Sequence, residues 1–146
     1  MRDREQAALS AWVRLLKAHA LLLREARRGL PEGLTLPQFD VLVQLERRPQ
    51  GMTAAELTRE LLVTAGNLTG IVDRLATAGL VSRSRDARDA RARRLRLTAS
   101  GRRRLGRALP RHARAVSGPF LALSRPELRQ LRELLGRLGQ PAREDA

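Results

Sequence analysis

The sequence predicts a mainly α-helical fold with one small β-hairpin, in a single domain that spans residues 1–146. Apolar residues recur at steps of three and four through most of the chain, which is the period of helices with one buried face. Threonine or serine residues suited to capping precede several of these periods. Alternation of the kind that strands show occurs around residues 80–97.

The first helix is expected within residues 6–29. Glycine and proline at positions 29, 31 and 33 end the helical period. Its apolar stripe consists of Leu9, Trp12, Val13, Leu16, Ala20 and Leu23.

Two capping boxes open the next helices. The side chains of Thr35 and Gln38 can each bond the other's backbone amide, which predicts a second helix that runs to about Arg48. Thr53 and Glu56 have the same spacing and begin a third, shorter helix through residue 62. The buried face of the second helix is expected to be Phe39, Leu42, Val43 and Leu45.

A short turn joins the third helix to a fourth. Thr64 can cap the fourth helix, and Gly79 is its expected end. Two helices joined in this way are typical of a helix-turn-helix. The apolar face of the fourth helix is Leu68, Ile71, Val72 and Leu75.

A hairpin follows directly. Residues 80–84 and 93–97 alternate or nearly alternate, and residues 85–92, which are all aspartate, arginine or alanine, lie between them. A hairpin placed after a helix-turn-helix is the wing of a winged helix, so we expect a winged helix-turn-helix over residues 35–97.

The rest of the chain is expected to be helical. Thr98 and Ser100 can begin a long helix in which Pro110 should cause a kink or an interruption. After the break at 118–119, Ser124 and Glu127 form another capping box before the last helix. The apolar side chains of that helix are Leu128, Leu131, Leu134, Leu135 and Leu138.

The charge of the chain points to nucleic acid as the partner. The formal net charge is +14, and eleven arginines lie between Arg83 and Arg107 against two aspartates. Arginine binds phosphate and guanine through two parallel hydrogen bonds. A solvated charged face is the alternative interpretation, but the arginines gather on the hairpin that a winged helix presents to DNA.

Several function classes are excluded or disfavoured. A chain without cysteine has no disulfide, zinc ribbon or thiol-based sensor. His19 and His112 are the only histidines and neither begins a ligand-spaced cluster, so no metal or other cofactor is expected. No catalytic motif is evident, and we expect no enzyme. Without an apolar run of about 20 residues or a secretory leader, a cytoplasmic protein is expected, with no membrane partner.

Residues 34–105 resemble the MarR family of bacterial winged-helix regulators. No single stretch decides the resemblance, but the stretches occur in order and at the right spacing. They are Leu34–Phe39, Met52–Leu57, Gly66–Leu75, Gly79–Val81, Asp89–Arg91 and Leu97–Arg102.

The resemblance implies a homodimer in which residues 6–29 and 99–138 pair the subunits and two winged helices bind a palindromic operator in double-stranded DNA. A terminal helix as amphipathic as the last one needs a surface to cover. We therefore expect a dimer interface that contains Leu9, Val13, Leu131, Leu134 and Leu138.

The resemblance also makes the fourth helix the recognition helix. Asn67 is then the best base reader, because its amide can both donate to and accept from adenine. Arg74 is expected to reach a phosphate or to pair near Asp73. Caps or solvent-facing polar residues are the alternative interpretation. The residues expected to face the major groove are Thr64, Asn67, Thr69 and Gly70.

In the wing, Asp89 and Arg91 match the family's Asp-x-Arg pattern, in which the acid holds the hairpin and the arginine contacts DNA. Arg91 is the first candidate for a DNA contact, and Arg88 is the second.

A small-molecule effector is implied by the resemblance. In many members, aromatic or phenolic acids or their thioesters bind between the dimerisation helices and the winged helix. Trp12, His19 and Phe39 are candidate liners of such a pocket, and packed core or dimer-interface side chains are the alternative interpretation.

The expected function is therefore a sequence-specific transcriptional repressor of a nearby operon, relieved by a small ligand of the aromatic-acid type. An architectural or non-specific nucleic-acid-binding protein would use the same basic surface. A transcriptional activator would differ only in where its operator lies.

Overall fold

The computed structural model describes residues 2–61 and 65–138, and it has the expected mainly helical fold with a small antiparallel sheet. The predicted fold class is confirmed. In chain order the elements are α1 (Arg2–Arg28), α2 (Leu36–Arg47), β1 (Met52–Thr53), α3 (Ala54–Leu61), α4 (Ala65–Thr77), β2 (Val81–Arg85), β3 (Arg93–Leu97), α5 (Ala99–Ser117), the 3-10 helix η1 (Gly118–Ala122) and α6 (Arg125–Leu138).

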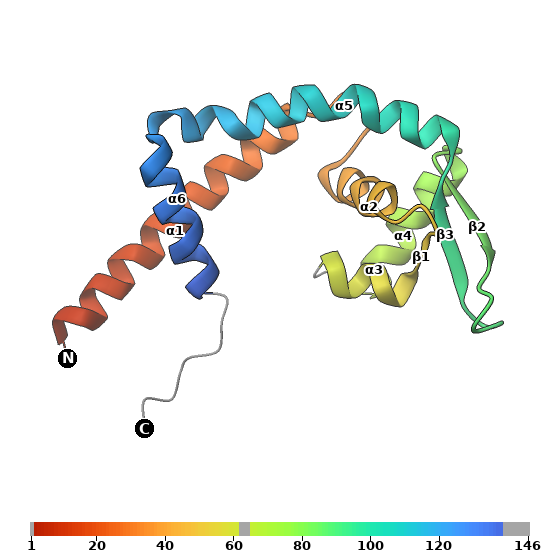
Figure 1. Ribbon diagram of the computed structural model, residues 1–146, viewed down its shortest axis with the longest axis horizontal. Helices are drawn as coiled ribbons and strands as arrows, with labels where there is room; N and C mark the ends of the chain where they lie inside the picture. The colour runs from red at the N-terminus through yellow and green to blue at the C-terminus, as the bar shows by residue number, and fades with distance from the viewer. Residues whose placement is uncertain (1, 62–64, 139–146) are drawn as a thin grey trace.

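The elements form an arch (Figure 1). One end contains α2, α3, α4 and the sheet, and the other contains α1 and α6. The long helix α5 spans the top and contacts α1 at one end and α2 at the other. This arrangement holds the winged helix-turn-helix apart from the terminal helices.

The predicted capping boxes are present. The Thr35 amide donates to the Gln38 carboxamide oxygen at 3.0 Å, and the Gln38 amide donates to the Thr35 hydroxyl at 3.4 Å. Thr53 and Glu56 exchange the same two bonds at the start of α3, at 2.8 and 3.3 Å. Reciprocal caps of this kind satisfy amides that a helix leaves unpaired at its start.

Some details differ from the sequence-based prediction, and one part of it lies outside the described residues. The first helix begins at Arg2 instead of Gln6, since residues 2–5 continue the helix without an apolar stripe of their own. Met52–Thr53 forms a third strand, which pairs with β3. Residues 62–64, which include the expected end of the third helix and the Thr64 cap, lie outside the described residues.

Of the two effects expected at Pro110, a kink or an interruption, the interruption is wrong, because α5 continues from Ala99 to Ser117. A proline removes one backbone N–H and crowds the carbonyl four residues earlier, which belongs to Gly106. Gly106 is exposed, so water can bond the carbonyl that loses its partner.

The core lies where α2 meets α3, α4, α5 and the sheet. Val41 of α2 is completely buried, whereas Val43, expected in the buried face, is half-buried. Because α2 is covered on several sides, its buried surface is wider than the single stripe that the period indicates. The largest fully buried side chains are Val41, Leu42, Leu45, Met52, Leu57, Leu68, Leu75 and Leu105.

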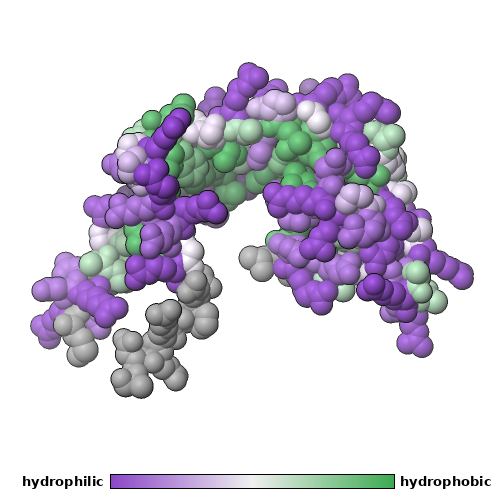
Figure 2. Space-filling model, in the orientation of Figure 1, coloured by the Kyte–Doolittle hydropathy of each residue, from purple (hydrophilic) through white to green (hydrophobic). Residues whose placement is uncertain are grey.

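The C-terminal end of α1 is fixed against α5. The backbone carbonyls of Ala26 and Arg28 lie 3.2 Å from His112 Nδ1 and from an Arg111 guanidinium nitrogen, respectively. At Gly29 a Cβ atom would lie 2.6 Å from the Ala115 Cβ, so a side chain is excluded where the two helices cross. In Figure 2, hydrophobic residues gather over α5 and the adjoining part of α1.

No helix in the described part of the chain is long and apolar enough to cross a membrane.

Candidate nucleic-acid interface

The exposed side of α4 is polar and small. Leu68, Val72 and Leu75 are buried in the core, which fixes the rotation of the helix. Asn67, Thr69 and Arg74 then lie on its exposed side, and Gly70 is half-buried. The structure therefore brings four of the predicted DNA-contacting residues of α4 to one surface, while Thr64 lies outside the described residues.

Nothing in the fold requires glycine at positions 66 and 70. A Cβ atom at either position would meet no atom within 4 Å. Glycine within a helix costs roughly 1 kcal/mol relative to alanine. Because no neighbour among the described residues explains that cost, the two glycines suit a helix whose backbone is approached by another molecule.

The wing places its arginines by strand alternation. Arg83 is paired with Leu95, and Arg85 with Arg93, so these side chains share the face that also carries the buried Val81. Ser82, Ser84, Arg94 and Arg96 lie on the other face. The face with Arg83 and Arg93 is the one turned toward α4.

One buried carboxylate organises the tip of the wing. Asp86 is 7% exposed and accepts hydrogen bonds from Arg94 Nε at 2.6 Å and from the amides of Asp89 and Arg88 at 3.1 and 3.3 Å. Arg94 also donates to the Gly51 carbonyl at 2.8 Å and lies 3.8 Å from Glu56. The Asp86–Arg94 pair thus ties the wing tip to the turn that precedes α3.

The same contacts explain the acidity of Asp86. The hydrogen bond from the Arg94 side chain holds the pKa of this carboxyl below its usual value, and the Arg94 charge and the two backbone amides act in the same direction. Asp86 is therefore ionised over the whole range of pH in which the protein would work.

The Asp-x-Arg pattern gives the holding role in the wing to Asp89, whereas in the structure the acid with the most contacts in the wing tip is Asp86. Among the described residues, the Asp89 carboxylate accepts one local bond, from the Arg91 amide at 2.9 Å, and the Asp89 backbone carbonyl accepts from the Ala92 amide at 3.0 Å. The wing tip contains two aspartates, Asp86 and Asp89, and no local sequence pattern indicates which of them is buried. The nearest available signal was the spacing of eight residues between Asp86 and Arg94 across a predicted hairpin.

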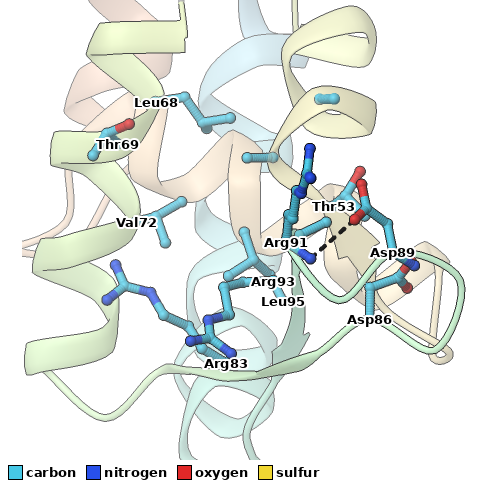
Figure 3. A pocket seen from close by; sticks show the side chains of 13 residues that line it. Thr53, Leu68, Thr69, Val72, Arg83, Asp86, Asp89, Arg91, Arg93 and Leu95 are labelled. Carbon is cyan, nitrogen blue, oxygen red and sulfur yellow. Dashed lines mark hydrogen bonds between the residues drawn. The ribbon is translucent and has the colours of Figure 1, made fainter.

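A groove of about 450 Å³ separates α4 from the wing. Thr69 lies on the α4 side, and Asp89 and Arg91 lie on the wing side (Figure 3). Arg83 and Arg93 add two further guanidinium groups from the strands. Threonine hydroxyls and arginines around an open groove are suited to the phosphates and base edges of a nucleic acid.

One ion pair among the described residues joins α4 to the wing beside this groove. Arg83 of β2 is paired with Asp73 of α4, and their side chains are 40% and 57% exposed. Arg74 is expected from the sequence to reach a phosphate or to pair near Asp73. It is exposed, and the ion-pair partner of Asp73 is Arg83.

The three candidate ligand residues are not brought together. Trp12 and His19 are exposed on α1. Phe39 is 3% exposed and belongs to the core, where its ring lies 4.3 Å from that of His112. Among the described residues, no group of three or more His, Asp or Glu side chains could hold a metal ion.

The terminal helices expose apolar side chains. Leu9 is 65% exposed on α1, and Leu138 is 72% exposed on α6. Val13 and Leu134 are about half exposed, and Leu131 is half-buried. The residues predicted for a dimer interface thus remain accessible in the single chain.

Sequence comparisons with a family model and with known relatives both indicate a transcriptional regulator. A family model described as the MarR family matches residues 32–92. A helix-turn-helix transcriptional repressor of Mycobacterium tuberculosis is 35% identical over 127 residues, which cover 86% of this chain and 90% of the relative.

Solved structures of regulators share the fold along most of the chain. The PcaV transcriptional regulator of Streptomyces coelicolor, in complex with its natural ligand, has a TM-score of 0.73 and 30% identity, and the match covers 88% of both chains. CouR of Rhodococcus jostii, bound to p-coumaroyl-CoA, has a TM-score of 0.77 and 26% identity, with 88% of this chain and 90% of CouR covered.

Proposed function

The chain belongs to the MarR family of transcriptional regulators, and on this premise we propose that it is a homodimeric repressor that binds a palindromic operator in double-stranded DNA. The observation that carries the proposal is the groove between α4 and the wing. It places the exposed Thr69 of α4 opposite arginines on β2 and β3, and Asn67 and Arg74 are exposed on the same helix. Sequence-specific binding needs both base readers and phosphate contacts, and polar helix residues beside wing arginines are the side chains suited to these two tasks.

In this proposal residues 35–97 bind DNA, with α4 in the major groove. Asn67 reads a base, Thr69 and Gly70 lie against the groove, and Arg74 reaches a phosphate. Arg91 and Arg88 extend the contact through the wing. Residues 6–29 and 99–138 pair two copies through the exposed apolar faces of α1 and α6, which explains why those faces are uncovered in one chain.

Repression and ligand control are proposed from the relatives. The mycobacterial relative is named a repressor, and the CouR structure contains an aromatic acyl thioester. We expect an aromatic acid or its thioester to release this protein from its operator. Trp12 and His19 are the accessible candidates to line that site, because Phe39 is already enclosed by the core.

The decisive experiment selects fragments of the host genome that the purified protein binds, and then titrates the best fragment and a scrambled duplex of equal length. We expect a large preference for the selected fragment and an inverted repeat within it. Equal binding of both duplexes would contradict sequence-specific regulation and favour the architectural alternative. The position of the repeat relative to the promoter distinguishes a repressor from an activator.

Asn67→Ala tests the reading of bases. Loss of the amide should weaken binding to the selected fragment by about 1–3 kcal/mol and relax the preference at one or two base pairs. Gln6→Ala, which removes an exposed amide from the far end of α1, is the control and should leave the base preference unchanged. If Asn67→Ala weakened both duplexes equally and kept its base preference, another residue would be the reader.

A further inference from the structure

The acidic residue on the exposed side of α4 is unexpected for a DNA-binding surface. Asp73 is the only acid in Ala65–Thr77, and it lies one helical turn from Thr69, which lines the groove. A carboxylate at this place repels the phosphates that the neighbouring arginines attract. Its presence therefore needs an explanation other than attraction to DNA.

Structural support of the wing does not explain it. The Asp73–Arg83 pair is exposed on both sides, and exposed pairs add little to stability. The wing is already fixed by the Asp86–Arg94 pair, whose side chains are only 5% and 16% exposed, and by the pairing of β3 with both β1 and β2. The hairpin thus has other, less exposed contacts that attach it to the rest of the winged helix.

Charge balance in the groove suggests another role. Arg83, Arg91 and Arg93 line the groove, and within the described residues only the Arg83 guanidinium among these three has a carboxylate at ion-pair distance. In a chain of net charge +14, sequence-independent attraction to any DNA is strong. Neutralising the charge of one arginine in the groove lowers this attraction. The effect is largest for DNA that offers no base contacts, because nothing compensates for the lost attraction there.

We propose that Asp73 is a specificity-determining residue, whose carboxylate neutralises Arg83 in the groove between α4 and the wing and thereby limits binding to DNA that offers no base contacts. The inference rests on the proposed DNA-binding function and adds a repulsive element to it. Specificity is a difference between two affinities, and a charge that opposes the wrong partner increases that difference.

Asp73→Asn tests the inference, because it keeps the shape of the side chain and frees Arg83 for phosphate. The probes are the selected genomic fragment and the scrambled duplex, each titrated at several salt concentrations. We expect Asp73→Asn to bind both duplexes more tightly, to gain more on the scrambled one, and to steepen the slope of log K against log salt by about 0.9, the value for one added phosphate contact. The same substitution in an Arg83→Ala background should leave the slope unchanged.

Glu46→Gln is the matched control. It breaks an equally exposed pair, Glu46–Arg102, outside the groove and changes the net charge by the same amount. If Glu46→Gln steepened the slope as much as Asp73→Asn, net charge alone would account for the effect and the inference would be overturned. Weaker binding of Asp73→Asn to both duplexes would also overturn it, because the pair would then position the wing.

Failure of the proposed function gives a different result. A wild-type protein that bound both duplexes equally would contradict sequence-specific regulation. The slope on the scrambled duplex would still decide whether Asp73 neutralises Arg83, because phosphate contacts do not depend on an operator.

Discussion

The Asp86 carboxylate accepts hydrogen bonds from the Arg94 guanidinium and from two amides of the wing tip, which places a buried negative charge within the most basic part of the chain. Removing one partner of a buried pair leaves the other without compensation. At the scale of single residues, the shape of the wing therefore depends on this pair more than on the exposed arginines around it.

A pH dependence follows from Asp86. The pKa of its carboxyl is lower in the folded protein than the value of about 3.9 in an unfolded chain, so its ionised form stabilises the fold above that pH. The contribution is lost as the pH falls through the folded pKa. We expect Asp86→Asn to have a lower melting temperature than the wild type at pH 7, and the difference to shrink below about pH 4.

The control for this measurement is Asp89→Asn, which removes an exposed charge from the same tip and keeps an acceptor for the Arg91 amide. It should lower the melting temperature less at pH 7. A difference between the wild type and Asp86→Asn that stayed constant down to pH 2 would show that the charge of Asp86 is not what stabilises the wing.

Arg91 of the wing is predicted to contact a DNA phosphate. As a phosphate contact from the wing, Arg91→Ala should weaken the selected and the scrambled duplex to a similar degree and reduce the slope of log K against log salt by about one. Arg107→Ala, which removes an exposed arginine on α5 outside the groove, should change the slope much less. Unchanged affinity of Arg91→Ala for both duplexes would show that the wing tip does not touch DNA.

At the scale of elements, the joint between the wing and α5 depends on Gly101. Its amide donates to the Thr98 hydroxyl at 3.0 Å, and a Cβ atom there would lie 2.1 Å from the Leu80 carbonyl oxygen. Gly101→Ala should therefore destabilise the protein by about 1–3 kcal/mol, because backbone must move to admit the methyl group. Denaturant unfolding measures this change.

Gly106→Ala is the matched substitution in the same helix. A Cβ atom there meets nothing within 4 Å, so alanine should stabilise the protein by about 0.5–1 kcal/mol through its helix propensity. Equal effects of the two substitutions would mean that propensity, and not the contact with Leu80, determines the outcome at Gly101.

Elements with a local chemical signature were predictable from the sequence. The capping boxes at Thr35 and Thr53, and Gly79 with its φ of 70° after α4, depend on neighbouring residues alone. Strand β1 was not predictable, because two residues have no period and their pairing with β3 depends on a distant part of the chain. The continuity of α5 through Pro110 likewise depends on the exposure of Gly106, which only the tertiary structure determines.

The residues of the candidate site likewise divide into those that local sequence predicts and those that depend on contacts between distant elements. Asn67, Thr69 and Arg91 are candidates that the sequence alone suggests, because the helix and the wing that position them are defined locally. The pairs Asp73–Arg83 and Asp86–Arg94 are not suggested by the sequence, because ion pairs between elements require knowledge of which faces meet.

At the scale of the whole molecule, the exposed apolar faces of α1 and α6 predict association. Leu134→Glu places a charge within the apolar stripe of α6 and should convert dimers into monomers at micromolar concentration, as measured by sedimentation equilibrium. Gly136→Glu places the same charge on the opposite side of α6 and should leave the dimer intact. A wild-type protein that sedimented as a monomer at this concentration would contradict the proposed dimeric operator complex.

Because α1 is held against α5 near Gly29, a small rotation of α1 at this crossing moves its N-terminal end by a large distance. The helix has 27 residues and is thus about 40 Å long, and its C-terminal end is clamped against Arg111, His112 and Ala115. A rotation of α1 by only about 5° about this crossing displaces the N-terminal end of the helix by roughly 3.5 Å. This displacement is close to the rise of one base pair along DNA, about 3.4 Å. In the proposed dimer, in which α1 helps to pair the two copies, a ligand that rotates α1 by this amount where it crosses α5 is expected to shift one winged helix relative to the other by a comparable distance.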